Sequence, residues 1–129
     1  MTHTFRNPAS LPPPQGRYSQ AVEVRPGARY LFISGQVGMS ADGTIPPTFD
    51  EQCRQINTNI FALLADADMR PTDLVKLTVF LTDPHQVLAH GKIRREFLGD
   101  HQPASSAVVV QTLNPAWLLE VEAIAASDA

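Results

Sequence analysis

Ser105 and Ser106 lie side by side where the polar stretch HQPASS enters a run of valines, and a serine hydroxyl can act as a nucleophile. It does so only beside a base, which is usually a histidine held by a carboxylate. The four histidines of the chain form no recognised triad pattern with these serines, and no G-x-S-x-G turn is present. A serine at the start of a strand more often hydrogen-bonds to the backbone, so a nucleophile is not expected here.

Glu120 and Glu122 are two residues apart in an expected strand and therefore share a face. Their carboxyl groups could lie roughly 6–8 Å apart, a separation that admits a water molecule between an acid and a base. Their neighbours Leu119 and Val121 indicate a largely buried strand. A partly buried glutamate needs a partner or a raised pKa, and either would suit proton transfer. A solvated strand face is the alternative.

The sequence offers no pattern for a metal ion or a bound nucleotide. His85 and His90 are five residues apart in an expected helix, whereas ligands on one helical face are three or four apart. Cys53 is the only cysteine, so neither a cysteine zinc site nor an internal disulfide can form within one chain. The stretch ISGQVG lacks the G-x-G-x-x-G pattern, and its Gly35 and Gly38 are expected where backbone or ligand approaches closely.

The composition suits one domain over residues 1–129, with a proline-rich lead over residues 1–15. Hydrophobic residues make up 43% of the chain, which is enough for one sizeable core. The formal net charge is −3 and no block of like charges occurs, so nucleic acid and membranes are not expected partners. We expect a cytoplasmic protein, because the chain shows neither a signal segment nor the roughly 18 apolar residues of a membrane span.

The clearest expected element is an amphipathic helix over residues 49–69. Thr48 and Glu51 form a capping box at its start, and Pro71 follows its end. Its apolar residues recur at intervals of three and four, as one face of a helix requires: Phe49, Cys53, Ile56, Ile60, Leu63, Leu64 and Ala67. This face is expected to pack on a sheet.

A second helix and five strands complete the expected order β-β-α-β-α-β-β. The second helix covers residues 84–98, with Asp83 as its cap and Gly99 as its stop. The strands are expected at residues 18–24, 29–39, 73–82, 105–113 and 117–125. The Pro-Gly turn between the first two strands predicts that they pair as an antiparallel hairpin.

These elements predict an α+β fold in two layers, with a mixed sheet and two helices on one face. The other face of the sheet is then left open, although several strands are apolar on both sides. An exposed apolar area of that size marks an interface, so we expect a homo-oligomer.

Five stretches, in order from Gly16 to Ala125, resemble one known family. They are GRYSQAV, LFISGQVG, LVKLTVFLTD, FLGDHQPASSAV and LEVEAIA. In this order and spacing they are similar to the Rid family of reactive intermediate deaminases, also called YjgF. The resemblance implies a chorismate-mutase-like fold and a homotrimer, with small-molecule clefts between neighbouring subunits. Typical members hydrolyse imines and enamines to ketoacids and ammonia, without a metal or a cofactor.

Four residues match positions that line the cleft of the family. Tyr18 matches a tyrosine of the early G-P-Y motif, and Ser34 and Gly35 match the S-G-Q wall. Glu120 matches a glutamate that positions or activates water, so the resemblance implies that Glu120 is the catalytic residue.

Residue 105 departs from the family pattern. The family has P-A-R-S, whose arginine grips a substrate carboxylate, whereas this chain has Pro103-Ala104-Ser105-Ser106, so the two serines are the expected ligand contacts. An arginine makes two charge-assisted hydrogen bonds to a carboxylate, and loss of such a bond costs roughly 1.5–3 kcal/mol. We therefore expect deamination of 2-imino acids to be weak or absent, and the ligand to be uncharged or differently charged.

Other substitutions leave alternatives open. Arg17 replaces the proline of G-P-Y and could bring a charge to the cleft, although the alternation of an extended segment favours a solvent-facing side chain. Gly91 stands where the family often has an asparagine, and Arg94 and Arg95 are expected on a solvated helix face. A non-catalytic ligand-binding or regulatory trimer is the alternative to an enzyme, and the acidic composition argues against a ribonuclease.

Overall fold

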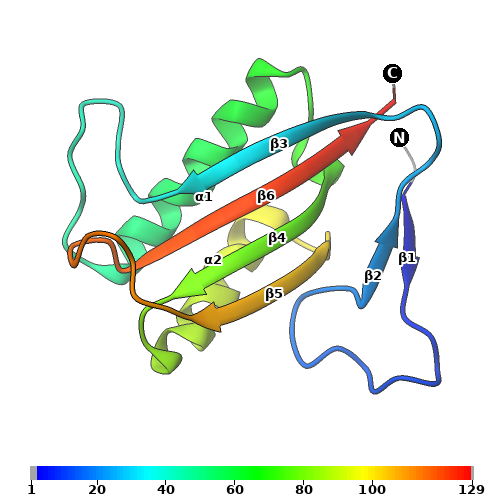
Figure 1. Ribbon diagram of the computed structural model, residues 1–129, viewed down its shortest axis with the longest axis horizontal. Helices are drawn as coiled ribbons and strands as arrows, with labels where there is room; N and C mark the ends of the chain where they lie inside the picture. The colour runs from blue at the N-terminus through cyan, green and yellow to red at the C-terminus, as the bar shows by residue number, and fades with distance from the viewer. Residues whose placement is uncertain (1–2, 129) are drawn as a thin grey trace.

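The computed structural model describes residues 3–128, and its main layer is a four-stranded mixed sheet backed by two helices (Figure 1). The elements are β3 Arg29–Gln36, α1 Phe49–Asp66, β4 Leu74–Leu81, α2 Val87–Leu98, β5 Ala104–Val109 and β6 Leu119–Ser127. The strand order is β3-β6-β4-β5, in which β4 and β5 are parallel and the other neighbours antiparallel. Both helices lie behind the sheet in Figure 1, so the predicted α+β fold with two helices on one face is confirmed.

A second, two-stranded sheet pairs β1 (Thr4–Arg6) with β2 (Ala21–Glu23). It lies beside the start of β5, where Ser19 and Ala104 form a parallel bridge. The Ser19 hydroxyl also donates a hydrogen bond of 2.6 Å to the carbonyl of Gln102. These contacts hold the segment between β1 and β2 against one edge of the main sheet.

The predicted hairpin between residues 18–24 and 29–39 is wrong, because β2 pairs with β1 and β3 pairs with β6. Gly27 does adopt a turn conformation, with φ of 80°, but the connection from β2 to β3 spans residues 24–28 and turns a corner instead of reversing the chain. Pairing with β6 is favoured because it seats the apolar inner face of β3, including the buried Ile33, on the core.

Helix α1 begins as the capping box predicts. The Thr48 hydroxyl accepts the Glu51 backbone N–H at 3.2 Å and donates to the Glu51 carboxylate at 2.7 Å. The helix ends at Asp66, three residues before its predicted end, since Asp68 turns the chain out of the helix with φ of 54°.

Helix α2 begins later than predicted. Asp83 does cap a helical turn by accepting the His85 backbone N–H, but that turn, Pro84–Gln86, is a 3₁₀ helix, and the α-helix starts at Val87. Gly99 ends it with φ of 58°, as predicted.

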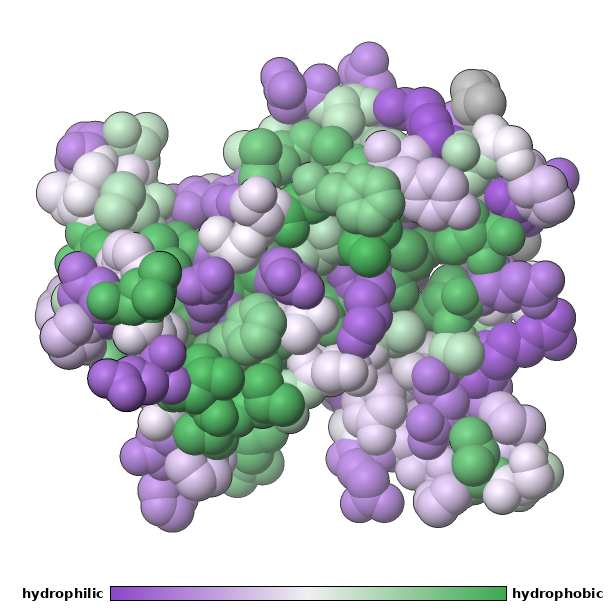
Figure 2. Space-filling model, in the orientation of Figure 1, coloured by the Kyte–Doolittle hydropathy of each residue, from purple (hydrophilic) through white to green (hydrophobic). Residues whose placement is uncertain are grey.

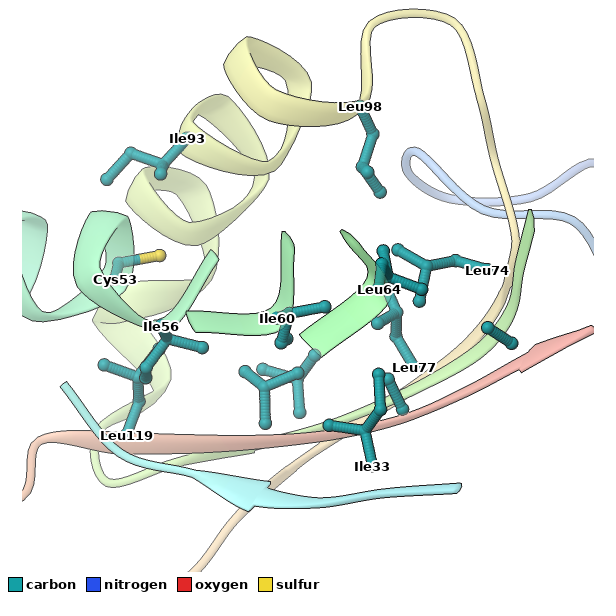
Figure 3. Packing of buried hydrophobic residues seen from close by; sticks show 14 of the residues in the cluster. Ile33, Cys53, Ile56, Ile60, Leu64, Leu74, Leu77, Ile93, Leu98 and Leu119 are labelled. Carbon is teal, nitrogen blue, oxygen red and sulfur yellow. The ribbon is translucent and has the colours of Figure 1, made fainter. Parts of the chain in front are cut away.

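The core lies between the helices and the inner face of the sheet (Figure 3). Alternate residues of β4 and β6 point inward, as the period of a strand requires. Figure 3 shows Ile56, Ile60 and Leu64 of α1 facing Leu77 and Leu119 of the sheet. Full burial of each such side chain stabilises the fold by roughly 1.5–3 kcal/mol, so this layer dominates the free energy of folding.

The outer face of the sheet is open and partly apolar. Tyr30 and Phe32 stack on this face with ring centroids 6.2 Å apart, and 73% of Phe32 is exposed. Figure 2 shows hydrophobic side chains gathered over β3 and β6 and near the end of β5. Within residues 3–128, no helix is long and apolar enough to cross a membrane.

Gln52 on α1 is buried and ties two loops to the helix. Its amide nitrogen donates to the carbonyls of Pro46 and Ala116, both at 2.9 Å, and its amide oxygen accepts the Leu118 N–H at 2.9 Å. Gly38 lets the chain after β3 pass close by, because a Cβ atom there would lie 2.7 Å from the Gln52 Cα. This side chain therefore fixes where β6 begins, one residue before Glu120.

We expect Gln52→Ala to lower the free energy of unfolding by roughly 2–4 kcal/mol, because a buried side chain is removed and three part-buried backbone groups lose their partner. Urea denaturation measures this loss. The matched control is Gln55→Ala on the same helix, where the lost partner is the Asn59 side chain and the expected change is below about 1 kcal/mol. Equal unfolding midpoints for the two variants would contradict the role given to Gln52.

Candidate functional site

A cleft of about 490 Å³ lies at the β5 edge of the sheet, between α2 and the segment that precedes β2. The predicted residues Arg17, Tyr18 and Ser105 line it together with His90 and Arg94. The Tyr18 hydroxyl oxygen accepts the Gln15 backbone N–H at 3.2 Å, which holds the ring against its own segment. One strand, one helix and one irregular segment thus converge on a single hollow, which polar and apolar groups line together.

Arg94 is not on a solvated face, and that prediction is wrong. The residue is only 7% exposed. Its Nη2 donates to the Ser105 hydroxyl at 2.9 Å, and its Nη1 donates to the backbone carbonyl of Arg17 at 3.3 Å. A guanidinium therefore does occupy this cleft, although it comes from α2 and not from residue 105. Arg95, the next residue, is exposed as predicted.

The charge state of the cleft is set by burial. Burial lowers the pKa of Arg94 to about 10, so its guanidinium stays protonated at neutral pH. Burial and then the nearby Arg94 charge lower the pKa of His90 to about 3, so its imidazole is neutral at pH 7. The helix side of the cleft thus carries one positive charge from Arg94, and His90 adds none.

Ser105 and Ser106 point to opposite faces of the sheet. Ser105 pairs with the buried Leu77 and faces the helices, whereas Ser106 pairs with Thr78 on the open face. The Ser106 hydroxyl accepts a hydrogen bond of 2.9 Å from the Lys76 ammonium group. The two serines, predicted as a pair, therefore do not act on the same ligand within one chain.

Arg17 is half-buried at the rim of the cleft. The contact that ties it to the site is its backbone carbonyl, which accepts from Arg94. Arg17 is thus tied to the site through its backbone, whereas Arg94 brings its charged side chain into the cleft.

A second group of predicted residues gathers on the open face, around Glu120. The pairing of β3 with β6 shifts between Ile33 and Gln36, so that Ser34 and Gly35 lie opposite a single residue of β6. This is the pattern of a β-bulge, which bends a strand and re-aims its side chains. The Glu120 side chain lies directly over Gly35.

The Glu120 carboxylate is half-buried beside a cavity of about 270 Å³, which is also lined by Phe80 and Thr112. No side chain or backbone group among residues 3–128 hydrogen-bonds to this carboxylate, so its oxygens are open to water. A carboxylate held over a bare backbone and open to water can accept a proton from that water.

One chain does not bring Glu120 to the Ser105 cleft. Glu120 pairs with Phe80 on the open face, whereas Ser105 faces the helices on a strand two positions across the sheet. The structure thus divides the predicted site into an Arg94 group, with Tyr18 and Ser105, and a Glu120 group, with Ser34 and Gly35. A site that used both groups would need two copies of the chain.

Arg94 and His90 were missed by the sequence analysis, although a signal was present. They are four residues apart and thus share one helical face, which includes Val87 three residues before His90. That face borders the segment before β2. The position of this segment depends on its bridge to β5, which is distant in sequence, so the local sequence does not predict it. Within residues 3–128, no cluster of three or more histidine, cysteine or acidic side chains could hold a metal ion.

This architecture defines a class: small α+β proteins with two helices on one face of a mixed sheet and hollows on both sides of it. The family model described as Endoribonuclease L-PSP matches residues 9–127. The chain belongs to that family, which is also known as YjgF or Rid, so the predicted resemblance is confirmed.

Individual relatives agree with this assignment. A RutC family protein from Pyrococcus horikoshii is 34% identical over 118 residues, which cover 90% of this chain and 91% of that protein. The 2-iminobutanoate/2-iminopropanoate deaminase of Capra hircus is 37% identical over 124 residues, covering 95% and 85%. The crystal structure of YyfB, a Rid family protein from Yersinia pestis, superposes with a TM-score of 0.88 at 30% identity, covering 98% of this chain and 100% of that one.

We expect Gly35→Ala to displace the Glu120 side chain, because a Cβ atom at residue 35 would lie 2.8 Å from its Cδ and 3.1 Å from its Cγ. The glutamate is flexible and can swing away, so the loss of stability should stay below about 1 kcal/mol. A crystal structure of the variant would show the displacement, and thermal unfolding would measure its cost.

Gly91→Ala is the control, since a methyl group there meets no atom within 4 Å and removes a helix-interior glycine. It should leave Glu120 in place and stabilise α2 by roughly 1 kcal/mol. An unmoved Glu120 carboxylate in Gly35→Ala would refute the close approach.

Proposed function

We propose that this chain is a Rid-type hydrolase that acts on a small imine or enamine in a cleft formed between copies of the chain. The observation that carries the proposal is the division of the family's site residues between two faces, with Glu120 open to water on one and a charged, tyrosine-lined cleft on the other. The relative named 2-iminobutanoate/2-iminopropanoate deaminase, 37% identical, supports this class of reaction.

The proposed reaction adds water across a C=N bond. Glu120 takes a proton from water as the water oxygen bonds to the imine carbon, and the proton passes to the nitrogen. Collapse of the resulting carbinolamine breaks the C–N bond and releases a carbonyl compound and ammonia, so one water is consumed per imine. General base catalysis of this kind contributes typically 10²- to 10⁴-fold to the rate.

Gly35 serves this reaction by its lack of a side chain. The bulge at Ser34 and Gly35 brings bare backbone under the carboxylate, which positions Glu120 without burying it. The substrate would enter from the side of a second copy, whose Tyr18 and Ser105 would line the opposite wall. In this arrangement Ser106, which faces the open side beside Lys76, could reach the ligand of a neighbouring cleft.

Residue 105 by itself offers a substrate one neutral hydrogen bond. If the carboxylate of a 2-imino acid bound to residue 105 alone, serine would give roughly 1.5–3 kcal/mol less binding free energy than an arginine at that position. We therefore expect slower turnover of such substrates than in a chain with the P-A-R-S arginine. A nucleic-acid substrate is not favoured, because a net charge of −3 opposes binding to phosphate.

We expect the protein to be a homotrimer, and sedimentation at micromolar concentration should give the mass of three chains. Phe32→Glu should shift the protein toward monomers, because Phe32 is 73% exposed on the open face. Leu63→Glu, on the helix layer, is the control and should leave the mass unchanged. A wild-type monomer would remove the basis for a cleft between copies.

We expect Glu120→Gln to lower imine hydrolysis by at least 100-fold, since glutamine cannot accept the proton from water. An amino-acid oxidase generates 2-imino acids in place, and semicarbazide traps what the protein leaves unhydrolysed. The matched control is Glu122→Gln, two residues along the same strand and exposed, which should keep its activity.

Equal activity in the Glu120→Gln and Glu122→Gln variants would refute the role of Glu120. If the wild-type protein hydrolyses no imine but is stabilised by a ligand, it is a binding protein and the proposed hydrolase is wrong.

A further inference from the structure

The Arg94 guanidinium is buried without a counter-charge. Residues 3–128 place no carboxylate within 4.0 Å of it, and the groups that it meets are the neutral Ser105 hydroxyl and Arg17 carbonyl. A charge taken out of water is costly unless it is paired. A leucine or methionine at this place would support the fold at less cost, so packing alone does not explain an arginine here.

The guanidinium also has donors to spare. It carries five N–H groups in a planar fork, and two of them are used by Ser105 and Arg17. Since Arg94 lines the 490 Å³ cleft, the remaining N–H groups can serve a ligand there. A planar carboxylate is the group that matches this fork.

Other groups of the cleft favour an anion over a cation. The lining includes Arg17 and Tyr18 but no aspartate or glutamate. His90 is neutral at pH 7, because its pKa is lowered to about 3, and it therefore neither competes with Arg94 for the anion nor adds charge. Arg94 is thus the buried positive charge toward which an anionic ligand would be drawn.

We propose that Arg94 binds a carboxylate group of the substrate, and that Ser105 orients the guanidinium for this contact. The substrate class is therefore a small imine or enamine that carries a carboxylate, and the ligand is not uncharged as residue 105 alone suggests. This inference rests on the proposed function, because it assigns the Ser105 cleft to the substrate.

The position of the charge adds a further constraint. Arg94 Nη2 lies one hydrogen bond from the Ser105 hydroxyl, so the guanidinium sits close to the strand. An arginine at residue 105 would project its own guanidinium several bonds further out. The carboxylate must therefore reach deeper toward α2 in this chain than in a relative with the P-A-R-S arginine.

The test uses a matched pair of stable probes, 2-oxobutanoate and its neutral amide, 2-oxobutanamide. Calorimetry on the assembled wild-type protein should show at least tenfold tighter binding of the acid, the difference expected for a charge-assisted hydrogen bond. Arg94→Met should abolish this preference, while Arg95→Met, on the exposed side of the same helix, should keep it.

Two further variants separate binding from folding. Ser105→Ala should weaken acid binding less than Arg94→Met, because it removes the orienting hydroxyl and leaves the charge. Arg94→Lys keeps a charge without the fork and should retain part of the preference, even if Arg94→Met fails to fold. Thermal unfolding of Arg94→Met should be unchanged or shifted upward, which a structural arginine would not allow.

The inference is overturned if 2-oxobutanoate does not bind at millimolar concentration, or if acid and amide bind equally well to the wild-type protein. It is also overturned if Arg94→Met keeps the preference and Arg17→Met loses it. Acid preference through Arg94 without imine hydrolysis would refute only the proposed hydrolase. Imine hydrolysis without acid preference would refute only the role of Arg94.

Discussion

Strand β4 lies between β5 and β6, and its pairing with both neighbours decides which face each site residue occupies. The pairing with β5 sets Leu77 opposite Ser105, and the pairing with β6 sets Phe80 opposite Glu120. Because Leu77 is buried in the core, Ser105 must face the helices, and because Phe80 points outward, Glu120 must face the open side. A slip of one residue in either pairing would exchange these faces and would also expel the core residues. The same burial that stabilises the fold therefore holds the two parts of the site in register.

Burial also governs the electrostatics of the cleft. A guanidinium near the protein surface would be screened by water and salt and would bind a small anion weakly. Arg94 is shielded by α2 and by the segment before β2, so its interaction with an anion would occur at a lower effective dielectric. A buried charge costs stability unless it is paired, and the two hydrogen bonds of Arg94 go to neutral groups. Such an imbalance is typical of sites that bind a ligand.

The sequence alone was sufficient to predict the helices and strands whose apolar pattern is strong and local. The stripe behind Thr48 predicted α1, and alternation around Glu120 predicted that Glu120 and Glu122 share a face. The pairing of β2 could not be predicted, because a Pro-Gly turn signals a change of direction and says nothing about the distant partner strand. The burial of Arg94 could not be predicted for a similar reason. The spacing of the arginines on α2 is typical of a solvated helix face. Arg94 is buried only once the segment that carries Tyr18 packs against that face.

A single substitution in a motif does not show that a chemical group has been lost from a site. Ser105 was identified as the place where an arginine is missing, and the folded chain places the Arg94 guanidinium 2.9 Å from that serine. An arginine at residue 105 would bring a second positive charge against Arg94. Serine at residue 105 is thus compatible with arginine at residue 94, whereas two arginines at these positions would repel each other. We therefore propose that the two positions form one anion-binding unit, in which the strand provides the support and the helix provides the charge.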